Sequence, residues 1–231
     1  MKKDKFEKKN VDFLVDEASR RIEEMIVTAE LKPGVIVSEK EISEHLGIGR
    51  TPVREALKRL EGTHMFKFLP RKGILIRVVT VDELLLQMEP RKVLEELVVK
   101  RAAKYAFPEE REQLRKLATE YRKITEEWAP AIEALRIDDE FNRLLCKASK
   151  NPFIGQMLLP QHALARRQYY LNYFIDKELT ARVNDSHARL MDAVADGNVE
   201  KALAELDELF VNLKQFNSIS LSTWIQLDQD H

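Results

Sequence analysis

The chain has few of the residues that mark secreted, redox-active or β-rich proteins. Of its 231 residues, one is cysteine, seven are glycine and eight are proline, and aromatic residues make up 7%. The single cysteine, Cys146, excludes an intramolecular disulfide. Few glycines and prolines favour a largely helical protein over one rich in turns and short strands. The length suggests one or two domains.

Signals for membranes, export and common catalytic chemistry are also missing. There is no run of about eighteen apolar residues, so we expect no transmembrane helix. The N-terminus, MKKDKFEKKN, is charged and has no apolar segment of the kind that a secretory signal carries. We therefore expect a cytoplasmic protein that does not enter a membrane. The chain has no Ser/His/Asp spacing, no phosphate-cradling glycine loop and no CxxC pair.

The segment 38–60, SEKEISEHLGIGRTPVREALKRL, has the pattern of two helices joined by a tight turn. Ser38 and Glu41 have the spacing of a capping box, which predicts the start of the first helix. Gly47 is predicted to end that helix, because glycine adopts positive φ without steric cost. The second helix is predicted from about Arg50. Its buried stripe is apolar, and cations lie at its start and along its other side.

A β-hairpin is predicted directly after the second helix. In residues 65–79, MFKFLPRKGILIRVV, apolar residues alternate on both sides of a Pro/Gly turn at 69–73, and the second strand is predicted to include Val78. A helix-turn-helix followed by a cation-tipped hairpin is a winged helix, which inserts the start of its second helix into the major groove. We therefore predict a DNA-binding domain over residues 1–79. The alternative is a solvated helical hairpin whose arginines only keep it soluble.

The charge of the chain is distributed unevenly between its two halves. Residues 1–80 hold 17 Lys and Arg against 13 Asp and Glu, whereas residues 81–231 hold 21 against 26. A positive end attracts phosphate while an acidic body avoids it. This asymmetry favours DNA binding through the N-terminal half.

The run LKPGVIVSEKEISEHLGIGRTPVREALKRLE resembles the DNA-binding domain of the GntR family of bacterial transcription regulators, and the resemblance extends over residues 11–79. Its most specific part is Gly47 with the run RTPVREAL that begins at Arg50. The resemblance implies contacts between double-stranded operator DNA and four residues of the two helices: Lys40, Arg50, Thr51 and Arg54. The cation-tipped hairpin adds Arg71, Lys72 and Gly73 as candidate DNA contacts. The resemblance also implies that Gly73 approaches the minor groove.

Two positions depart from the family pattern. Gly49 stands where the family usually has a small hydroxyl residue, so we expect one phosphate contact to be lost. His64 stands where a glycine usually ends the recognition helix. Histidine adopts the left-handed backbone conformation less readily than glycine, so we expect the entry to the wing to differ.

After residue 79 the pattern is helical throughout. Thr80 and Glu83 form another capping-box spacing, and Pro90 is predicted to break or kink the helix that begins there. Further helices are predicted over residues 91–106, 108–128, 131–149, 153–174, 178–195 and 199–216. These six or seven helices predict an antiparallel bundle over residues 80–231. The expected fold class is therefore mainly α, with a winged helix-turn-helix in front of an all-α bundle.

This half resembles the C-terminal sensor domain, or FCD domain, of the FadR subfamily of GntR regulators. The resemblance is carried by PRKVLEELVVKRAA with Arg91 and Glu95, by DDEFNRLLCKASKNPFI, and by SHARLMDAVADGNVEKALAEL. It implies a homodimer that binds a small metabolite, commonly a carboxylic acid, which changes operator affinity. A two-fold dimer reads a palindromic operator. Repression is the commoner outcome in the family, so we expect a repressor.

Many FCD domains hold a metal ion with one aspartate and three histidines. Asp138 and His187 match two of these ligands, whereas Asn142 and Leu209 replace the other two. Zinc sites normally need about three protein ligands. We therefore expect a metal-free polar site of Asp138, Asn142 and His187, with Arg91 as the partner of a ligand carboxylate. A divalent zinc or nickel ion on Asp138 and His187 is the alternative.

The predicted helix 153–174 carries further candidates. His162 is a candidate replacement for a lost metal ligand, and a second candidate lining consists of Arg166, Arg167, Tyr169 and Tyr170. The alternative for the second group is a solvated face with aromatic rings packed beneath it. Two other functions remain open: a metal-dependent enzyme on the helical half, which the incomplete ligand set disfavours, and an architectural DNA binder without a ligand.

Overall fold

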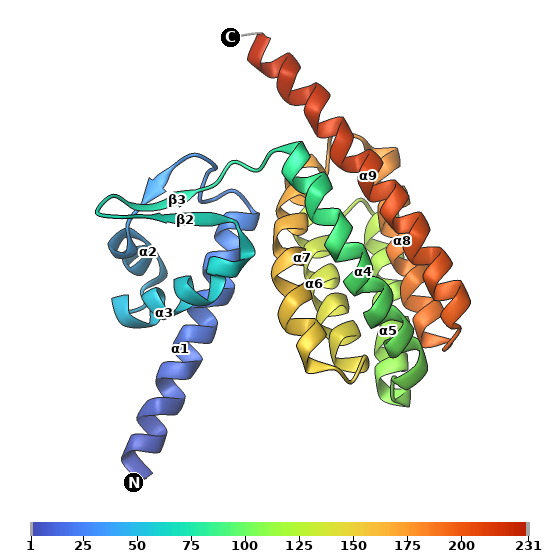
Figure 1. Ribbon diagram of the computed structural model, residues 1–231, viewed down its shortest axis with the longest axis horizontal. Coiled ribbons are helices and arrows are strands. Elements are labelled where there is room, and N and C mark those ends of the chain that lie inside the picture. Colours follow the sequence, from blue (N-terminus) through green and yellow to red (C-terminus); the bar gives the residue numbers. More distant parts are fainter. Residues whose placement is uncertain (1, 230–231) are drawn as a thin grey trace. The chain divides into compact units, whose positions relative to one another are not determined.

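The computed structural model describes the backbone of residues 2–229 and the side chains of residues 11–218 (Figure 1). The chain forms two compact units, Met1–Val79 and Thr80–His231. The first unit contains α1 (Lys2–Val27), α2 (Glu39–Leu46) and α3 (Arg50–Leu60), followed by a short 3-10 turn at Glu61–Thr63. Its strands are β1 (Ile36–Val37), β2 (Phe66–Leu69) and β3 (Gly73–Ile76), in the antiparallel order β1-β3-β2. The predicted winged helix-turn-helix is confirmed.

Local signals account for the start and end of α2. The Ser38 hydroxyl accepts a hydrogen bond from the Glu41 N–H at 3.1 Å, and the Ser38 N–H donates to Glu41 Oε2 at 2.7 Å. Gly47 has φ of 65° and caps the other end. Helix α1 packs along α3, and Ile22, Val53 and the other apolar residues between them are buried. The recognition helix α3 is therefore held against α1 by a buried apolar interface.

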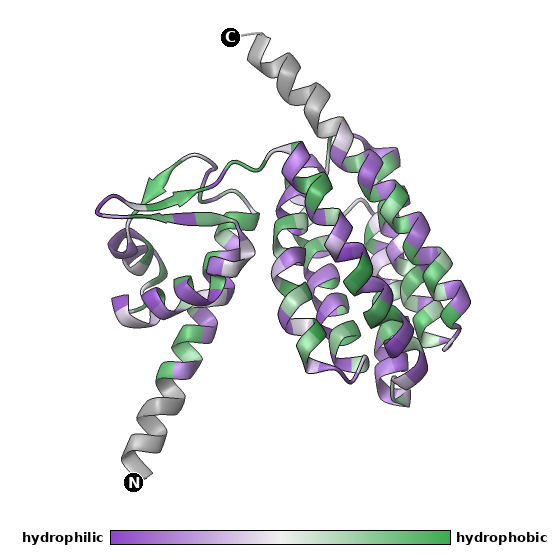
Figure 2. Ribbon diagram, viewed as in Figure 1, coloured by the Kyte–Doolittle hydropathy of each residue, from purple (hydrophilic) through white to green (hydrophobic). Residues whose placement is uncertain are grey.

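The wing has a shorter second strand than predicted and one strand that was not predicted. Strand β3 ends at Ile76, and the side chain of Val78 is 64% exposed, so its predicted place in the strand is wrong. Strand β1 has only two residues and pairs Ile36 with Leu75 and Val37 with Ile74. A strand of two residues shows no alternation of apolar and polar residues in the sequence. It forms because β3 supplies its hydrogen-bonding partner. Figure 2 shows hydrophobic strands and a hydrophilic turn between β2 and β3.

The second unit is a bundle of six described helices, as the sequence predicted (Figure 1). They are α4 (Val81–Tyr105), α5 (Pro108–Glu126), α6 (Ala131–Ala148), α7 (Pro152–Asn172), α8 (Lys177–Ala195) and α9 (Val199–Gln229). Helix α8 packs against α5 and α9, α4 packs against α9, and α6 packs against α7. None of the helices in the described part of the chain is long and apolar enough to span a bilayer.

Pro90 does not end a helix, because α4 continues through it. Proline removes the hydrogen bond to the carbonyl four residues earlier, which belongs to Leu86. Leu86 is 65% exposed and Pro90 is exposed too, so the missing hydrogen bond lies on the outer face of the helix and not in the core of the bundle. The capping box at the start of α4 is confirmed: the Thr80 hydroxyl accepts from the Glu83 N–H at 3.2 Å, and the Thr80 N–H donates to Glu83 Oε2 at 3.1 Å.

Arg111 of α5 joins the ends of two other helices. Its guanidinium donates to backbone carbonyls at the C-terminal ends of α4 and α8: Ala103 at 2.8 Å, Ala106 at 3.1 Å, Val194 at 3.1 Å and Ala195 at 3.0 Å. Gly197 follows α8 with φ of 74°, and a Cβ at this position would lie 2.9 Å from Arg111 Nη1. Glycine is favoured there by its backbone conformation, and a Cβ would also press on the Arg111 guanidinium and its hydrogen bonds.

Candidate DNA-binding surface and effector cavity

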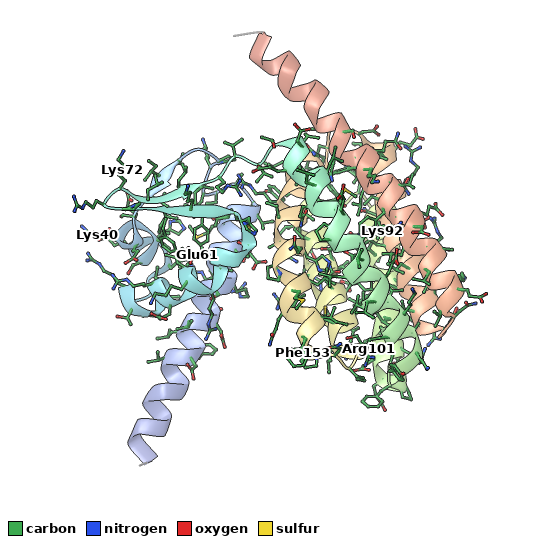
Figure 3. All side chains as sticks on the ribbon, in the orientation of Figure 1. Lys40, Glu61, Lys72, Lys92, Arg101 and Phe153 are labelled. Carbon is green, nitrogen blue, oxygen red and sulfur yellow. The ribbon has the colours of Figure 1, made fainter. Side chains whose placement is uncertain are left out.

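The first turns of α2 and α3 expose the cations expected to contact DNA. Lys40 is the second residue of α2, and Arg50, Thr51 and Arg54 lie in the first half of α3. All four are exposed, because the apolar residues between them, Val53 among them, face the core. Arg50 makes no hydrogen bond with another described residue. In Figure 3, Lys40 of α2 and Lys72 of the wing project toward the same edge of the N-terminal unit.

Arg54 is not a free cation, because it pairs with a carboxylate of the neighbouring helix. Its Nε lies 3.1 and 3.0 Å from the two carboxylate oxygens of Glu39, and one Nη lies 2.7 Å from Glu39 Oε2. These hydrogen bonds hold the pKa of Glu39 below its usual value. Glu39 is the first residue of α2, so the pair connects the two helices of the motif. An acidic residue thus lies among the expected DNA contacts.

The wing tip contains two residues with positive φ. Arg71 has φ of 61° and lies in a turn closed by the Lys72 N–H, which donates to the Leu69 carbonyl at 3.0 Å. The left-handed conformation costs a non-glycine residue about 1–2 kcal/mol. Gly73 has φ of 119°, and a Cβ there would lie 2.6 Å from the Val37 carbonyl oxygen. The pairing of β1 with β3 therefore already requires glycine at 73, independently of any DNA contact.

The structure gives each departure from the family pattern a physical consequence. Gly49 caps the N-terminus of α3 with φ of −58°, and no side chain bonds to the free N–H groups there. His64 adopts φ of 59° after the 3-10 turn, and its N–H points to the Glu61 carbonyl at 3.4 Å. The recognition helix is thus connected to the wing by a 3-10 turn, and the turn ends at His64 in the left-handed backbone conformation.

In the second unit, a small cavity of about 30 Å³ lies among α4, α5, α6, α7, α8 and α9. Its lining residues are Arg91, Tyr121, Leu135, Asp138, His162, Ala165, Arg166, Tyr169, His187 and Leu213. The structure therefore brings together Arg91, Asp138 and His187 and adds members of the second candidate group to the same site. Asn142 and Leu209 are buried but do not line the cavity, and neither do Arg167 and Tyr170.

His187 and Asp138 face each other across this cavity. His187 Nδ1 lies 2.9 Å from the Val183 carbonyl oxygen, which can only accept, so Nδ1 carries the hydrogen. His187 Nε2 lies 3.4 Å from Asp138 Oδ1. The rings of Tyr121 and Phe141 enclose the imidazole, with centroids 5.6 and 6.5 Å away. The histidine is thereby held with Nε2 toward the aspartate.

A buried cluster of Arg91, Glu95 and His162 forms the next part of the wall. Glu95 Oε1 lies 2.5 Å from Arg91 Nε and 2.9 Å from His162 Nε2. Burial alone would raise the pKa of Glu95, but Arg91 and His162 beside it hold that pKa at about 2. Burial lowers the pKa of His162, and its Nδ1 has no hydrogen-bond partner. The sequence shows the four-residue spacing of Arg91 and Glu95, but it does not show that His162, on another helix, joins them.

The remaining polar groups of the wall have partners of their own. Arg166 Nη1 lies 3.0 Å from Asp139 Oδ1, and the exposed Arg143 shares that carboxylate through Oδ2 at 2.7 Å. The Tyr169 hydroxyl donates to Asn184 Oδ1 at 2.5 Å. Burial raises the pKa of Tyr169 well above its usual value, so the hydroxyl stays neutral.

The residues around the cavity do not fit a resident zinc ion. In the described part of the chain, no group of three or more His, Cys, Asp or Glu side chains is close enough to hold a metal. His162 Nε2 is bonded to Glu95, and the described residues do not bring His162 into a group with Asp138 and His187 that could hold a metal. Two ligands fall short of the three that zinc sites normally have.

Comparisons with known proteins agree with both halves of the structure. The family model described as "Bacterial regulatory proteins, gntR family" matches residues 14–76, and the "FCD domain" model matches residues 85–212, more than half of the chain. The chain belongs to the GntR family of bacterial transcription regulators, with an FCD domain as its helical unit. As a GntR regulator it binds DNA through the winged helix, and its FCD domain is the effector domain.

Other GntR-family proteins are similar to it over most of its length. It is 28% identical to the "Nta operon transcriptional regulator" of Aminobacter aminovorans, over 78% of this chain and 83% of the relative. It is 26% identical to the "HTH-type transcriptional repressor RspR" of Escherichia coli K12, over 84% and 87%. The solved structure of E. coli McbR/YncC superimposes with a TM-score of 0.75 and 21% identity, covering 91% of this chain and 98% of that one, which shows the shared fold.

Proposed function

We propose that the protein is a cytoplasmic repressor that binds a palindromic operator as a homodimer and is not an enzyme. A small metabolite in the cavity of the FCD domain would change operator affinity. The observation that carries the proposal is the exposed cationic start of α3 beside the wing. The similarity to a relative named as a repressor supports the sign of regulation.

We assign base and phosphate contacts to the recognition helix and to its two flanking elements. Arg50 and Arg54 are suited to guanine edges or phosphate, and Thr51 to a phosphate or a thymine methyl group. Lys40 and the wing residues Arg71 and Lys72 would bind phosphate. A specific base contact of this kind contributes about 1–3 kcal/mol of discrimination.

An apolar stripe on α4 supports dimerisation. Leu86, Val93 and Leu97 are 65%, 69% and 45% exposed, and their spacing of seven and four residues places them on one face of the helix. Three large apolar side chains in a row at the surface indicate a protein contact. A second copy of the chain is the partner that fits, because a palindromic operator requires two recognition helices related by two-fold symmetry.

The cavity supplies the proposed effector site, with Arg91, Asp138 and His187 in its wall. A carboxylate on the effector would meet Arg91 of α4, which lines the cavity and uses its Nε for Glu95. The cavity volume of about 30 Å³ holds one or two water molecules, so a larger effector has to displace side chains on entry. That displacement would be the structural signal of binding.

Selection of binding sites from random duplexes, followed by mobility-shift titration, tests the DNA-binding part. We expect Arg54→Ala and Arg50→Ala to weaken operator binding about tenfold or more, the loss of one good base contact. Arg20→Ala is the matched control, because Arg20 is an exposed arginine of α1 paired with Glu17. Unchanged affinity in both recognition-helix variants would show that α3 does not read the operator.

Sedimentation analysis tests the dimer. Val93→Glu places a charge in the middle of the apolar stripe and is expected to yield monomers with weakened operator binding. Val211→Glu is the control, because Val211 is equally exposed, at 65%, but lies on α9. A Val93→Glu protein that remains dimeric would exclude this face of α4 as the interface.

A further inference from the structure

The exposed face of α4 carries its charges in a fixed order along the helix. At about 100° per residue, a set of exposed side chains lies within about 40° of the direction of Val93. In chain order these side chains belong to Asp82, Leu86, Glu89, Val93, Leu97, Lys100 and Lys104. Both carboxylates of the face therefore come before Val93, and both ammonium groups come after it.

The four charged side chains of this face have no counter-charge within their own chain. Among the described residues, none of the four takes part in a salt bridge. Lys92, which lies beside the face, instead pairs with Asp207 of α9 at 2.8 Å. The charges of the face are therefore available to a partner that approaches α4.

The helix macrodipole accounts for only half of this charge order. Asp82 lies in the first turn of α4 and Lys104 in the last, where each sign is favoured by the dipole of the helix itself. The dipole effect is confined to the first and last turns. Glu89 and Lys100 lie further inside the helix and follow the same order, so a second cause is needed for them.

The face is complementary to itself when the helix is reversed about Val93. Asp82 and Lys104 lie eleven residues on either side of Val93, which is about 16 Å along the helix axis in each direction. Two antiparallel copies of α4 that cross at Val93 therefore place Asp82 of one copy level with Lys104 of the other. Glu89 and Lys100 then differ in level by three residues, about 5 Å, which their long side chains can span. In a parallel pair, each charge would instead face its own like.

We propose that two copies of the chain pair through antiparallel α4 helices that cross at Val93. Asp82 of each copy faces Lys104 of the other, and the inner pair of Glu89 with Lys100 is formed in the same way. The inference rests on the proposed function, because it gives the orientation and register of the proposed dimer. A second copy is the partner that fits, since the charge order of α4 is its own complement and a two-fold axis forms each contact twice.

Charge reversal at the inner pair of the full-length protein tests the register. Glu89→Lys and Lys100→Glu each place like charges opposite each other at two symmetry-related positions, so each should weaken dimerisation about tenfold or more. The double variant Glu89→Lys/Lys100→Glu restores opposite charges and should dimerise as the parent does. Sedimentation at low salt measures the dissociation constants. Glu112→Lys, an exposed carboxyl on α5, is the control and should leave dimerisation unchanged.

The outcome of the double variant decides between a paired and an unpaired role. If its loss equals the two single losses combined, Glu89 and Lys100 do not face each other and the proposal is overturned. The proposal is also overturned if both single variants dimerise as the parent does. Circular dichroism checks that the variants are folded.

Crosslinking with a short bis-maleimide tests the orientation without changing the inner pair. Val93→Cys should crosslink to its own copy, because the two positions meet at the two-fold axis. Asp82→Cys should not, since the two positions lie about 33 Å apart in an antiparallel pair, but it should crosslink when mixed with Lys104→Cys. The parent, whose single Cys146 is buried, is the control. Crosslinks between two Asp82→Cys chains, and none in the mixture, would establish a parallel pair and overturn the proposal.

The same measurements separate this inference from the proposed function. A dimer that Val93→Glu breaks but that tolerates both charge reversals keeps the proposed interface and loses the antiparallel register. A dimer with the expected register that binds no DNA keeps the register and loses the regulatory function. A protein that stays monomeric overturns the register and the proposed dimer together.

Discussion

Glu39 holds Arg54 through both carboxylate oxygens, so the arginine expected to enter the DNA groove is already oriented by a neighbouring helix. A carboxylate that bonds to a guanidinium holds this planar group in one orientation before DNA binds. On random DNA the carboxylate repels phosphate, and on the operator a guanine edge can replace it. We therefore expect Glu39 to favour specific over nonspecific binding.

Replacing Glu39 with glutamine should raise affinity for random DNA more than affinity for the operator. Removing one negative charge at the phosphate-facing surface should strengthen nonspecific binding by roughly two- to tenfold, and the gain should shrink as salt is raised. The measurement is a pair of titrations, against operator and scrambled duplex, at low and high salt. Glu17→Gln on α1 is the control. An equal gain on both duplexes would show that Glu39 contributes only charge.

Gly49→Ser should stabilise the N-terminal unit and strengthen operator binding. The serine hydroxyl can accept from a free N–H at the start of α3, which lacks a side-chain cap, and this cap is worth a few tenths of a kcal/mol over glycine. A Cβ at position 49 has room, because its nearest neighbour, Pro52 Cδ, would lie 3.8 Å away. Urea unfolding and operator titration measure the two effects. If Gly49→Ala gives the same gain in stability, the effect comes from backbone entropy and not from capping.

The stability of the FCD domain should decrease at acidic pH in two stages. The pKa of His162 is lowered by burial, so the unfolded chain binds the proton more readily and stability falls as the pH drops below about 6.5. The pKa of Glu95 is depressed to about 2, so its contribution is complete above 4.5 and is lost as the pH falls toward 2. Urea unfolding at a series of pH values gives the profile.

His162→Gln should remove the upper stage of that profile, because glutamine keeps a donor for Glu95 but does not titrate. His45→Gln is the control, since His45 is exposed and lies in the winged helix. An upper stage that persists in His162→Gln would assign it to another group.

Arg111→Ala should destabilise the bundle by about 2–3 kcal/mol, because it leaves carbonyls at the ends of α4 and α8 without a charged donor. Arg115→Ala removes an exposed arginine on the same helix that reaches Ala195 and Asp196, and it should cost less than about 1 kcal/mol. Equal losses in the two variants, measured by denaturant unfolding, would show that the Arg111 contacts add nothing beyond a surface ion pair.

Features that depend on neighbouring residues could be predicted from the sequence, and features that depend on tertiary contacts could not. The capping boxes at Ser38 and Thr80 were predictable, because both partners lie within four residues of each other. The continuation of α4 through Pro90 was not, since it depends on which face of the helix meets solvent. The same holds for β1, a strand of two residues that exists only through its pairing with β3.

The candidate site shows the same division. Asp138 and His187 were found through family resemblance, and the structure places them face to face. His162 and Glu95 lie 67 residues apart, so no spacing rule could show that they share a hydrogen bond. Acidic residues are common at the start of a helix, so the sequence gives Glu39 no special role, and only the fold shows its carboxylate turned toward Arg54.

The pairing of β1 with β3 has a mechanical consequence for DNA recognition. Strand β1 leads directly into the cap of α2 at Ser38, and its partner strand begins at Gly73, at the wing tip. We therefore expect the wing and the recognition motif to keep a fixed position relative to each other when DNA binds. If the two grooves of a duplex do not match the spacing of the wing and the recognition helix, the duplex must bend before both elements can bind. The operator would then be chosen partly by its flexibility, at base pairs that no side chain touches.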